Sequence, residues 1–424
     1  MESALMVRSR IYWLFSLLLG FVSCETSEVG KVYQGWKEGE VDIHHIYTGR
    51  GESSFLIFPD GTSLLIDAGD WDPKDYPKMT VALPDTSRRA GEWIARYVSR
   101  VNPKGDNVDY LMVSHFHNDH TGDASNDVPM TSGRKQDYKL TGIMEVGEYL
   151  HFSKAFDRGY PDYSYPLPIE DEDVEHYRAF VAWKTRTDNL QSEKFEVGVL
   201  DQIKLLSGEY KYKDFHIRNL VSNGIVWMGE DADSLVACYD LNPENLRGWQ
   251  NENTKSMGFC LSYGAFRYFT AGDLSGTLLD ASGKKIEIDE LVAEVCGKVD
   301  VCKANHHAYL DAMSEGFVRN INADAYIIPV WDYEHIQPSV LARMASRRLS
   351  SESKNLIFAT NIPDTLRCAY KDAAWMPAMC QEDGHVVVKV FDGGSKYKIY
   401  VLSASDEQML VKAVYGPFVS KGER

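Results

Sequence analysis

The stretch Val108–Asp123 constrains the fold of this chain more than any other. Its apolar run, Tyr110–Val113, predicts a short buried strand. Directly after it come three histidines and two aspartates within nine residues: His115, His117, Asp119, His120 and Asp123. Such groups cost several kcal/mol when buried without partners. A bound metal removes this cost, because imidazole nitrogens and carboxylate oxygens are the ligands that suit zinc or iron. The stretch therefore predicts a metal site at the end of a buried strand.

The spacing His-x-His-x-Asp-His resembles the signature of the metallo-β-lactamase-fold hydrolases. The resemblance implies that His115 and His117 hold one metal ion, while Asp119 and His120 hold a second one nearby. It also implies an α/β fold, the four-layer αββα sandwich, with a long insertion in its first half. The remaining ligands are then expected at the ends of later strands.

The first half of the chain contains elements that suit such a sandwich. The apolar runs 54–58 and 63–66 flank Pro-Asp-Gly, a turn sequence because Pro fixes φ and Gly supplies a positive φ. Apolar side chains at three- and four-residue spacings predict a helix over 86–101. The second apolar run ends in an Asp-x-Gly that is similar to the family's, in which the aspartate braces the metal-binding loop; the resemblance assigns this role to Asp67.

A long insertion at about 124–214 is expected to shape access to the site. The resemblance implies that it also supplies the third ligand of the first metal, which is a histidine in most family members. The two candidates are His151 and Asp157, and we favour Asp157 because Asp-Arg-Gly precedes a sharply turning segment. Arg158 is a candidate for substrate contact, with packing of the insertion as the alternative.

The second half repeats the order of a hairpin followed by an aspartate. The runs 258–263 and 266–270 predict a hairpin around Gly-Ala, and Gly272-Asp273 follows it. This dipeptide is similar to the family's Gly-Asp, whose carboxylate bridges both metals. The resemblance therefore assigns the bridging role to Asp273.

A strand predicted over 299–305 ends in His-His-Ala-Tyr. This order is similar to the strand and His-His-Gly of the exported metallohydrolase domains of DNA-uptake (competence) proteins, the subtype that the chain most resembles. The resemblance makes His306 the last ligand of the second metal and places His307 behind it or facing the substrate. Either His307 or Tyr309 could then stabilise charge or protonate a leaving group. Tyr309 and His335 are further candidates for substrate contact, with a surface position as the alternative for His335.

The N-terminus resembles an export signal. Two arginines precede an apolar run at 11–22, which is too short for a membrane span of about 20 residues. Phe-Val-Ser-Cys at 21–24 is similar to a bacterial lipoprotein cleavage box, so we expect a signal peptide at 1–23 and an acylated Cys24, with a retained membrane anchor as the alternative. A tether at 24–40, the metallo-β-lactamase-like domain at 41–410 and a tail at 411–424 would follow. We expect a cell-envelope lipoprotein, or otherwise a periplasmic or secreted protein.

Together these features predict an exported dinuclear hydrolase. The cofactors would be two zinc ions, with iron or manganese as alternatives, and a metal-bridging hydroxide would attack the substrate. Catalysis would depend on Asp119, Asp273 and His307. The net charge of −17 opposes unselective nucleic-acid binding, so we expect a small-molecule or envelope-polymer phosphodiester. A lactonase or another ester or amide hydrolase is the alternative within this class. An iron-dependent dioxygenase and a non-catalytic envelope-binding lipoprotein are the alternatives from other classes.

Overall fold

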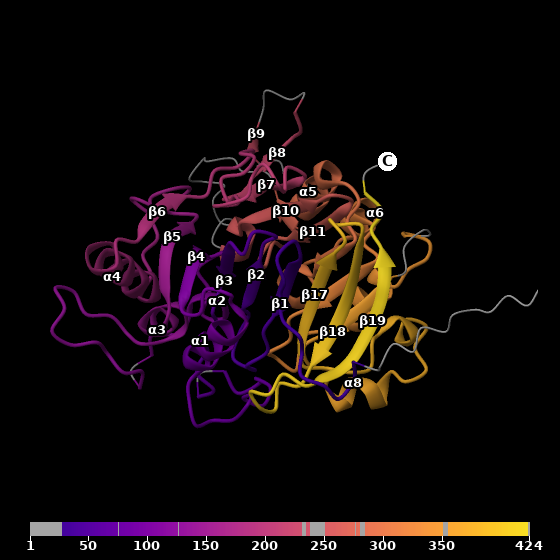
Figure 1. The fold of residues 1–424 in the computed structure, drawn as a ribbon, viewed down its shortest axis with the longest axis horizontal. Helices are drawn as coiled ribbons and strands as arrows, with labels where there is room; N and C mark the ends of the chain where they lie inside the picture. Colours follow the sequence, from indigo (N-terminus) through magenta and orange to yellow (C-terminus); the bar gives the residue numbers. More distant parts are fainter. Residues whose placement is uncertain are drawn as a thin grey trace, which may run out of the picture.

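The computed structural model describes residues 28–74, 76–125, 127–230, 235–237, 251–275, 277–279, 285–350 and 355–422. The expected signal peptide and Cys24 lie outside these ranges. Two multistranded sheets pack face to face, and helices cover their outer faces, which is the αββα sandwich that the sequence predicted (Figure 1). Within the described ranges, no helix is long and apolar enough to cross a bilayer.

The first sheet has the strand order β19-β18-β17-β1-β2-β3-β4-β5-β6 among the described residues. Its centre contains the predicted hairpin β2–β3, and β3, β4 and β5 then run parallel to one another. The parallel strands therefore end at one edge of the sheet. The strands are β1 (Val41–His45), β2 (Ser54–Ile57), β3 (Ser63–Ile66), β4 (Asn107–Met112), β5 (His151–Asp157), β6 (Gln191–Lys194), β17 (His385–Phe391), β18 (Lys396–Leu402) and β19 (Val411–Val419).

The second sheet has the order β16-β15-β14-β11-β10-β7-β8-β9 in the same described part of the chain. The predicted hairpin β10–β11 lies in its middle, and β11, β14, β15 and β16 are parallel. Its strands are β7 (Phe215–Ser222), β8 (Ile225–Trp227), β9 (Leu235–Ala237), β10 (Gly258–Tyr263), β11 (Phe266–Thr270), β14 (Val301–Lys303), β15 (Ala325–Ile328) and β16 (Leu356–Ala359), and a separate ribbon pairs β12 (Thr277–Leu279) with β13 (Lys285–Glu287).

Three apolar layers hold the sandwich together. The inner layer packs Leu64 and Tyr110 of the first sheet with Leu261 and Tyr268 of the second. The outer face of the first sheet is covered by α1, α3 and α4, and that of the second by α5, α6 and α7. The helices are α1 (Ala90–Val101), α2 (Asn118–Thr121), α3 (Gly142–Tyr149), α4 (Glu172–Thr187), α5 (Ile288–Cys296), α6 (Glu315–Ile321), α7 (Pro338–Met344) and α8 (Asp364–Ala369), with 3₁₀ turns η2 (Glu252–Lys255), η3 (Asn305–Ala308) and η4 (Met376–Ala378).

The predicted insertion and the predicted C-terminal tail both contribute strands to the first sheet. The insertion at about 124–214 contributes β5 and β6, which extend the first sheet in parallel. The expected tail at 411–424 contains β19, which pairs with β18 along its length. Side chains on both faces of β19 pack on the cores, Val411 and Val414 on one side and Tyr415 and Phe418 on the other, so this segment gains burial by joining the sheet.

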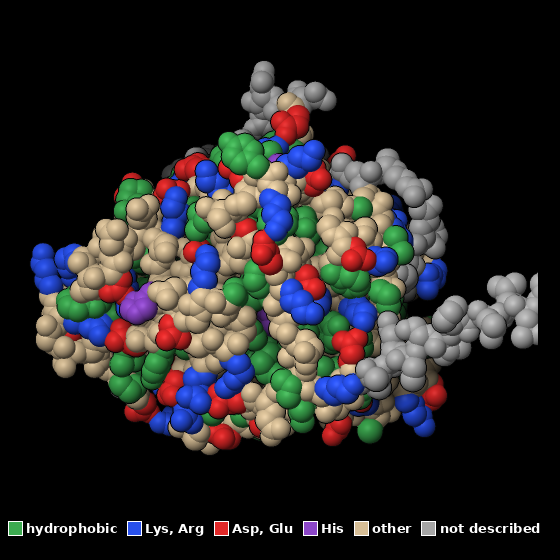
Figure 2. All heavy atoms as spheres, viewed as in Figure 1, with side chains coloured by type: hydrophobic (Ala, Val, Ile, Leu, Met, Phe, Trp, Pro, Cys, Tyr) green, Lys and Arg blue, Asp and Glu red, His purple; other side chains and the backbone are tan. Residues whose placement is uncertain are grey.

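The surface carries charges of both signs in spite of the strongly negative total. On the face drawn in Figure 2, Lys and Arg side chains are interspersed with Asp and Glu. Many of the basic groups are paired, for example Arg96 and Arg100, which both contact Glu407 at 2.7–2.8 Å. Such a surface gives little support to unselective phosphate-backbone binding, which needs a basic stripe.

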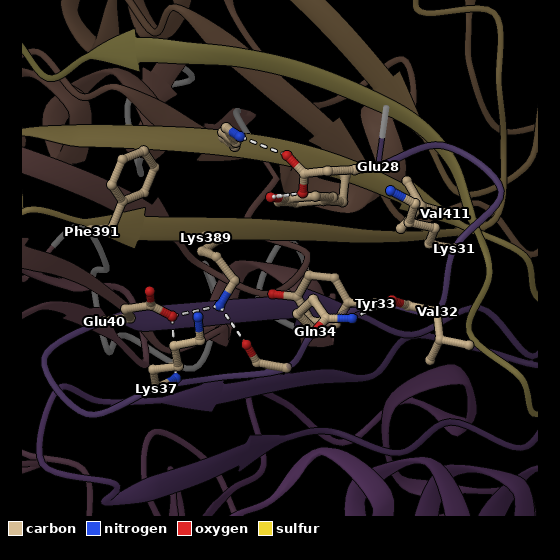
Figure 3. A pocket seen from close by; sticks show the side chains of 13 residues that line it. Glu28, Lys31, Val32, Tyr33, Gln34, Lys37, Glu40, Lys389, Phe391 and Val411 are labelled. Atoms are coloured by element: carbon tan, nitrogen blue, oxygen red, sulfur yellow. Dashed lines mark hydrogen bonds and ion pairs between the residues drawn. The ribbon is translucent and has the colours of Figure 1, made fainter. Parts of the chain in front are cut away.

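The segment 28–40 packs on the first sheet before β1 begins. Tyr33 donates a hydrogen bond to Asp42 at 2.7 Å, and the Lys389 ammonium contacts Asp42 at 2.9 Å. The same ammonium contacts Glu40 at 2.7 Å (Figure 3). A cavity of about 500 Å³ lies here, against β17 and β18. None of the predicted site residues lines it, and the charged groups at its base neutralise one another. The described part of the expected tether is therefore structured.

The buried His385 leads to a prediction on pH-dependent stability. Its Nδ1 accepts the Tyr47 backbone N–H at 3.0 Å, and burial lowers its pKa to about 3. Between pH 6.5 and 3 the unfolded chain therefore binds a proton that the folded chain does not, so stability falls as the pH falls. We expect His385→Gln to reduce the slope of the free energy of unfolding against pH by about 1.4 kcal/mol per pH unit. The free energy would be measured by urea unfolding from pH 7.5 to 4.5. The exposed His151→Gln is the matched control, and equal slopes in the two variants would contradict the prediction.

Candidate metal centre

The predicted metal loop lies where the edges of both sheets meet. It follows β4, passes through Ser114 and His115, and enters the short helix α2. In the second sheet, Asp273 follows β11 and His307 follows β14. Because these strands are parallel to their neighbours, their carboxyl ends share one edge, the usual place for a binding site in α/β proteins.

The three histidines of the loop are in mutual contact. His115 Nε2 lies 3.2 Å from His117 Nδ1, and the ring centroids of His115 and His120 are 4.1 Å apart. His115 is fully buried, and His117 is partly exposed at the mouth of the site. Burial, together with the neighbouring His120 and His117, lowers the pKa of His115 well below its usual range. The imidazole is therefore neutral, the form that binds a metal.

The second half of the chain closes on this loop. His120 Nε2 lies 3.3 Å from Asp119 Oδ2 and 3.1 Å from Asp273 Oδ2. His307 Nε2 lies 3.1 Å from each of the same two oxygens. Burial alone would raise the pKa of Asp273, but His120 and His307 hold it well below its usual range, so the carboxylate stays ionised. The predicted convergence of Asp273 on the histidine loop is present in the structure.

Glu52 is a site residue that our sequence reasoning missed. Glu52, His120, Asp273 and His307 are all buried, and each offers a ligand atom within 4.8 Å of the others. Glu52 precedes β2, and its backbone N–H donates to the Asp119 carbonyl at 2.7 Å, which fixes it beside the metal loop. The available signal was an acidic residue between Gly51 and a serine, directly before an apolar strand.

Lys303 is the second residue that was missed. It is buried in β14, with its Nζ 2.8 Å from Glu52 Oε2, 3.7 Å from Asp273 Oδ1 and 2.6 Å from the Gly272 carbonyl. Burial alone would lower its pKa, but Glu52 and Asp273 raise it, so the ammonium remains charged. A lysine inside an otherwise apolar strand was its signal in the sequence.

Hydrogen bonds from behind orient the imidazoles. Asp67 Oδ2 lies 2.8 Å from His120 Nδ1, and Asp67 also accepts the backbone N–H and the hydroxyl of Ser114 at 2.7 and 2.6 Å. This is the bracing position that the resemblance implied for Asp67. The Pro329 carbonyl lies 2.7 Å from His307 Nδ1. Each contact places the Nδ1 proton at the back, so the Nε2 atoms of His120 and His307 face the carboxylates and are the atoms available to a metal.

The donor set fits a divalent cation. The centre buries four carboxylates, those of Glu52, Asp67, Asp119 and Asp273, against the single ammonium of Lys303, which leaves an excess of three negative charges when the histidines are neutral. Among the described residues, His120 Nε2 and Asp273 Oδ1 are buried without a hydrogen-bond partner. Bound cations supply both the missing charge and the missing partners, and mixed histidine–carboxylate ligation suits zinc, iron or manganese.

The two neighbouring histidines exchange the positions that we expected for them. His306 turns away from the carboxylates; its Nδ1 lies 2.6 Å from Asp311 Oδ1, its Nε2 lies 3.2 Å from Asn253 Nδ2, and its side chain is 19% exposed. His307 faces the centre instead. The cause is a run of three left-handed residues, His306, His307 and Ala308, with φ of 45°, 49° and 60°. Ala308 thus adopts the conformation for which the family uses glycine.

Neither candidate for the third ligand of the first metal joins this centre. Asp157 is buried, but its carboxylate accepts hydrogen bonds from the backbones of Gly159 and Tyr160 and from the hydroxyls of Tyr163 and Tyr177, at 2.7–3.2 Å. It therefore stabilises the turn that follows β5. His151 begins β5, beside Asn107 and roughly 20 Å along the strand from Asp157, and its side chain is 65% exposed.

The expected substrate contacts divide into two groups. Arg158 is 1% exposed and forms a two-pronged ion pair with Glu252 at 2.6 and 2.5 Å, so it packs the insertion and does not face substrate. His335 stacks on His307 with centroids 4.4 Å apart, and Tyr309 lies at the rim, 5.4 Å from His306 and 6.4 Å from His335. His335 and Tyr309 therefore lie beside the centre.

Comparison with known proteins agrees with this geometry. Residues 47–126 match the family model of the metallo-beta-lactamase superfamily. The matched part contains Glu52, Asp67 and the whole His-x-His-x-Asp-His loop, whereas Asp273 and His307 lie beyond it. The search of curated proteins found no match. These findings support a metallo-β-lactamase superfamily domain and add nothing on the competence-protein subtype.

The pair His306 and His307 offers a direct test of the ligand set. Because His307 Nε2 faces both carboxylates and His306 does not, His307→Ala should weaken metal affinity by more than about 100-fold, above the 10-fold to 100-fold range typical of residues that only support a ligand. His306→Ala should retain nearly full metal content. Zinc and manganese bound after dialysis against graded chelator would be measured by elemental analysis. Metal loss in His306→Ala with retention in His307→Ala would restore the sequence-based assignment.

Proposed function

We propose that this protein is a metal-dependent hydrolase of phosphodiesters or related esters. The observation that carries the proposal is the convergence of Asp119, Asp273 and His307 from distant parts of the chain, at 3.1 Å contacts, in a buried centre with excess negative charge. When bound there, divalent cations act as Lewis acids that activate water and polarise the scissile group. Such chemistry is common among hydrolases with this donor set.

The chain's own residues prepare the centre for this chemistry. Asp67 and the Pro329 carbonyl fix the orientation of the His120 and His307 rings, so neither ring has to turn to present its Nε2 to a metal. The Lys303 ammonium contacts both Asp273 and Glu52 and so keeps the two carboxylates in place. Since His307 is committed to the centre, we assign protonation of the leaving group to the hydroxyl of Tyr309, a residue that is partly exposed beside His306.

Charge and the similarity of Asp273 to the family's bridging carboxylate support the proposed substrate class. The resemblance that places Asp273 between two metals favours phosphoesterase and lactonase relatives over the zinc β-lactamases. A net charge of −17 and the mixed surface of Figure 2 disfavour long nucleic acids, which bind through basic stripes. We therefore propose a small phosphodiester or an envelope polymer as substrate, and two metal ions, zinc first, as the cofactors.

The cellular location belongs to the same proposal. The basic and apolar N-terminal sequence and the box ending in Cys24 support export and acylation, which would bring the enzyme to envelope substrates. The centre itself does not depend on this placement, because its residues lie between positions 52 and 307.

Replacing Asp273 tests the proposed activity. Asp273→Asn keeps the shape of the side chain but removes its charge, so we expect kcat/KM for a chromogenic phosphodiester to fall by about 100-fold or more, which corresponds to about 2.7 kcal/mol. Purified protein loaded with zinc, manganese or iron would be assayed against phosphodiester, lactone and β-lactam substrates.

The matched control is Asp311→Asn, which changes an aspartate beside His306 and outside the centre, and should keep most of the activity. Full activity in Asp273→Asn would contradict the proposal. Preferred hydrolysis of a lactone would change the substrate class, and oxygen consumption by the iron-loaded protein would indicate a dioxygenase. A protein that binds no metal and hydrolyses none of the substrates would be a binding protein.

A further inference from the structure

Trp331 places a buried hydrogen-bond donor at the metal centre. It follows β15, its side chain is 3% exposed, and its indole Nε1 lies 3.3 Å from His307 Nε2. The two rings meet edge to face, with centroids 5.9 Å apart and an interplanar angle of 88°. The indole N–H is therefore directed at the nitrogen that also contacts Asp119 and Asp273.

This contact cannot persist unchanged when a cation binds. Because the His307 Nδ1 proton is held by the Pro329 carbonyl, the only acceptor that His307 offers to Trp331 is its Nε2 lone pair. The same lone pair is the ligand atom in the cluster of Glu52, His120, Asp273 and His307. Once it is committed to a cation, Trp331 keeps a buried donor without that acceptor, which costs roughly 1–3 kcal/mol unless another oxygen takes its place.

We propose that Trp331 is a positioning residue whose indole N–H binds an oxygen of the substrate or product oxyanion at the loaded centre. The inference rests on the proposed metal-dependent function and specifies which group would hold the oxyanion. Indole is a donor that never accepts, so it selects oxygen atoms and does not compete for the metal. A preorganised donor in a buried site is worth far more than one in water.

Contacts from the first half of the chain fix the orientation of Trp331. Its carbonyl accepts the Thr80 N–H at 2.8 Å, and Met79 pairs with Asp332 in a β-bridge. Trp71 and Tyr76 pack against the indole in tilted orientations, at centroid distances of 5.3 and 5.4 Å. Tyr76 also hydrogen-bonds Asp332. The indole is thus held between the segment 71–80 and the His307 ring, as a rigid donor must be.

Trp331→Phe tests the donor while keeping an aromatic ring in the stack. The metal-loaded protein would be titrated with inorganic phosphate, and with acetate as a carboxylate probe, by calorimetry. We expect Trp331→Phe to bind at least one of these oxyanions about 10-fold more weakly than wild type, with unchanged metal content. Trp71→Phe removes an indole N–H from the same stack without a contact to His307, and should leave the affinity unchanged.

A second readout does not depend on the Trp331 variant folding. The chain contains nine tryptophans, so ¹⁵N-tryptophan labelling of the metal-loaded wild-type protein reports on nine indole groups. Addition of phosphate should move one of the indole N–H resonances downfield. That resonance should persist in Trp71→Phe.

Equal oxyanion affinities of Trp331→Phe and wild type would overturn the proposal, as would loss of metal in Trp331→Phe or failure of loaded wild type to bind either oxyanion. Oxyanion binding that depends on Trp331 but occurs without hydrolysis of any substrate would support this proposal and reject the hydrolase function. The two can therefore fail separately.

Discussion

The contacts of one carboxylate oxygen connect the whole centre. Asp273 Oδ2 lies 3.1 Å from both His120 Nε2 and His307 Nε2, so a residue after β11 meets one after β4 and another after β14. These contacts form only when the two sheets pack with their carboxyl edges in register. The inner apolar layer, which includes Leu64 and Tyr268, fixes that packing. The chemistry of the centre is therefore a consequence of how the two sheets associate.

Short-range patterns predicted much of this arrangement. The hairpins β2–β3 and β10–β11 follow from turn sequences between apolar runs, and α1 follows from its apolar spacing, although it begins at Ala90 and not at residue 86. The metal loop and Asp67 were predictable because their residues lie close together in the sequence or directly follow a strand. Asp273 was predictable only because it repeats the hairpin-then-aspartate order of the first half.

The remaining features depend on tertiary contacts that local sequence does not encode. Glu52 and Lys303 meet across 251 positions of the chain, so neither was recognisable alone. The choice between His306 and His307 depends on a left-handed run that ends in Ala308, and alanine gives no signal for a positive φ. Sequence also could not show that two tyrosines and two backbone amides donate hydrogen bonds to the oxygens of Asp157, the residue favoured as the third ligand.

The excess of buried carboxylates has a consequence for any related protein that has lost its metal. A descendant that no longer bound metal would keep Glu52, Asp119 and Asp273 crowded in a dry interior, where Lys303 and the protonated forms of His120 and His307 would have to offset their charges. Since unpaired buried charge is costly, drift would soon replace these acids with amides or apolar residues. A bound cation would offset the same charges while leaving His120 and His307 neutral, so metal binding and protonation of these histidines would compete at this centre.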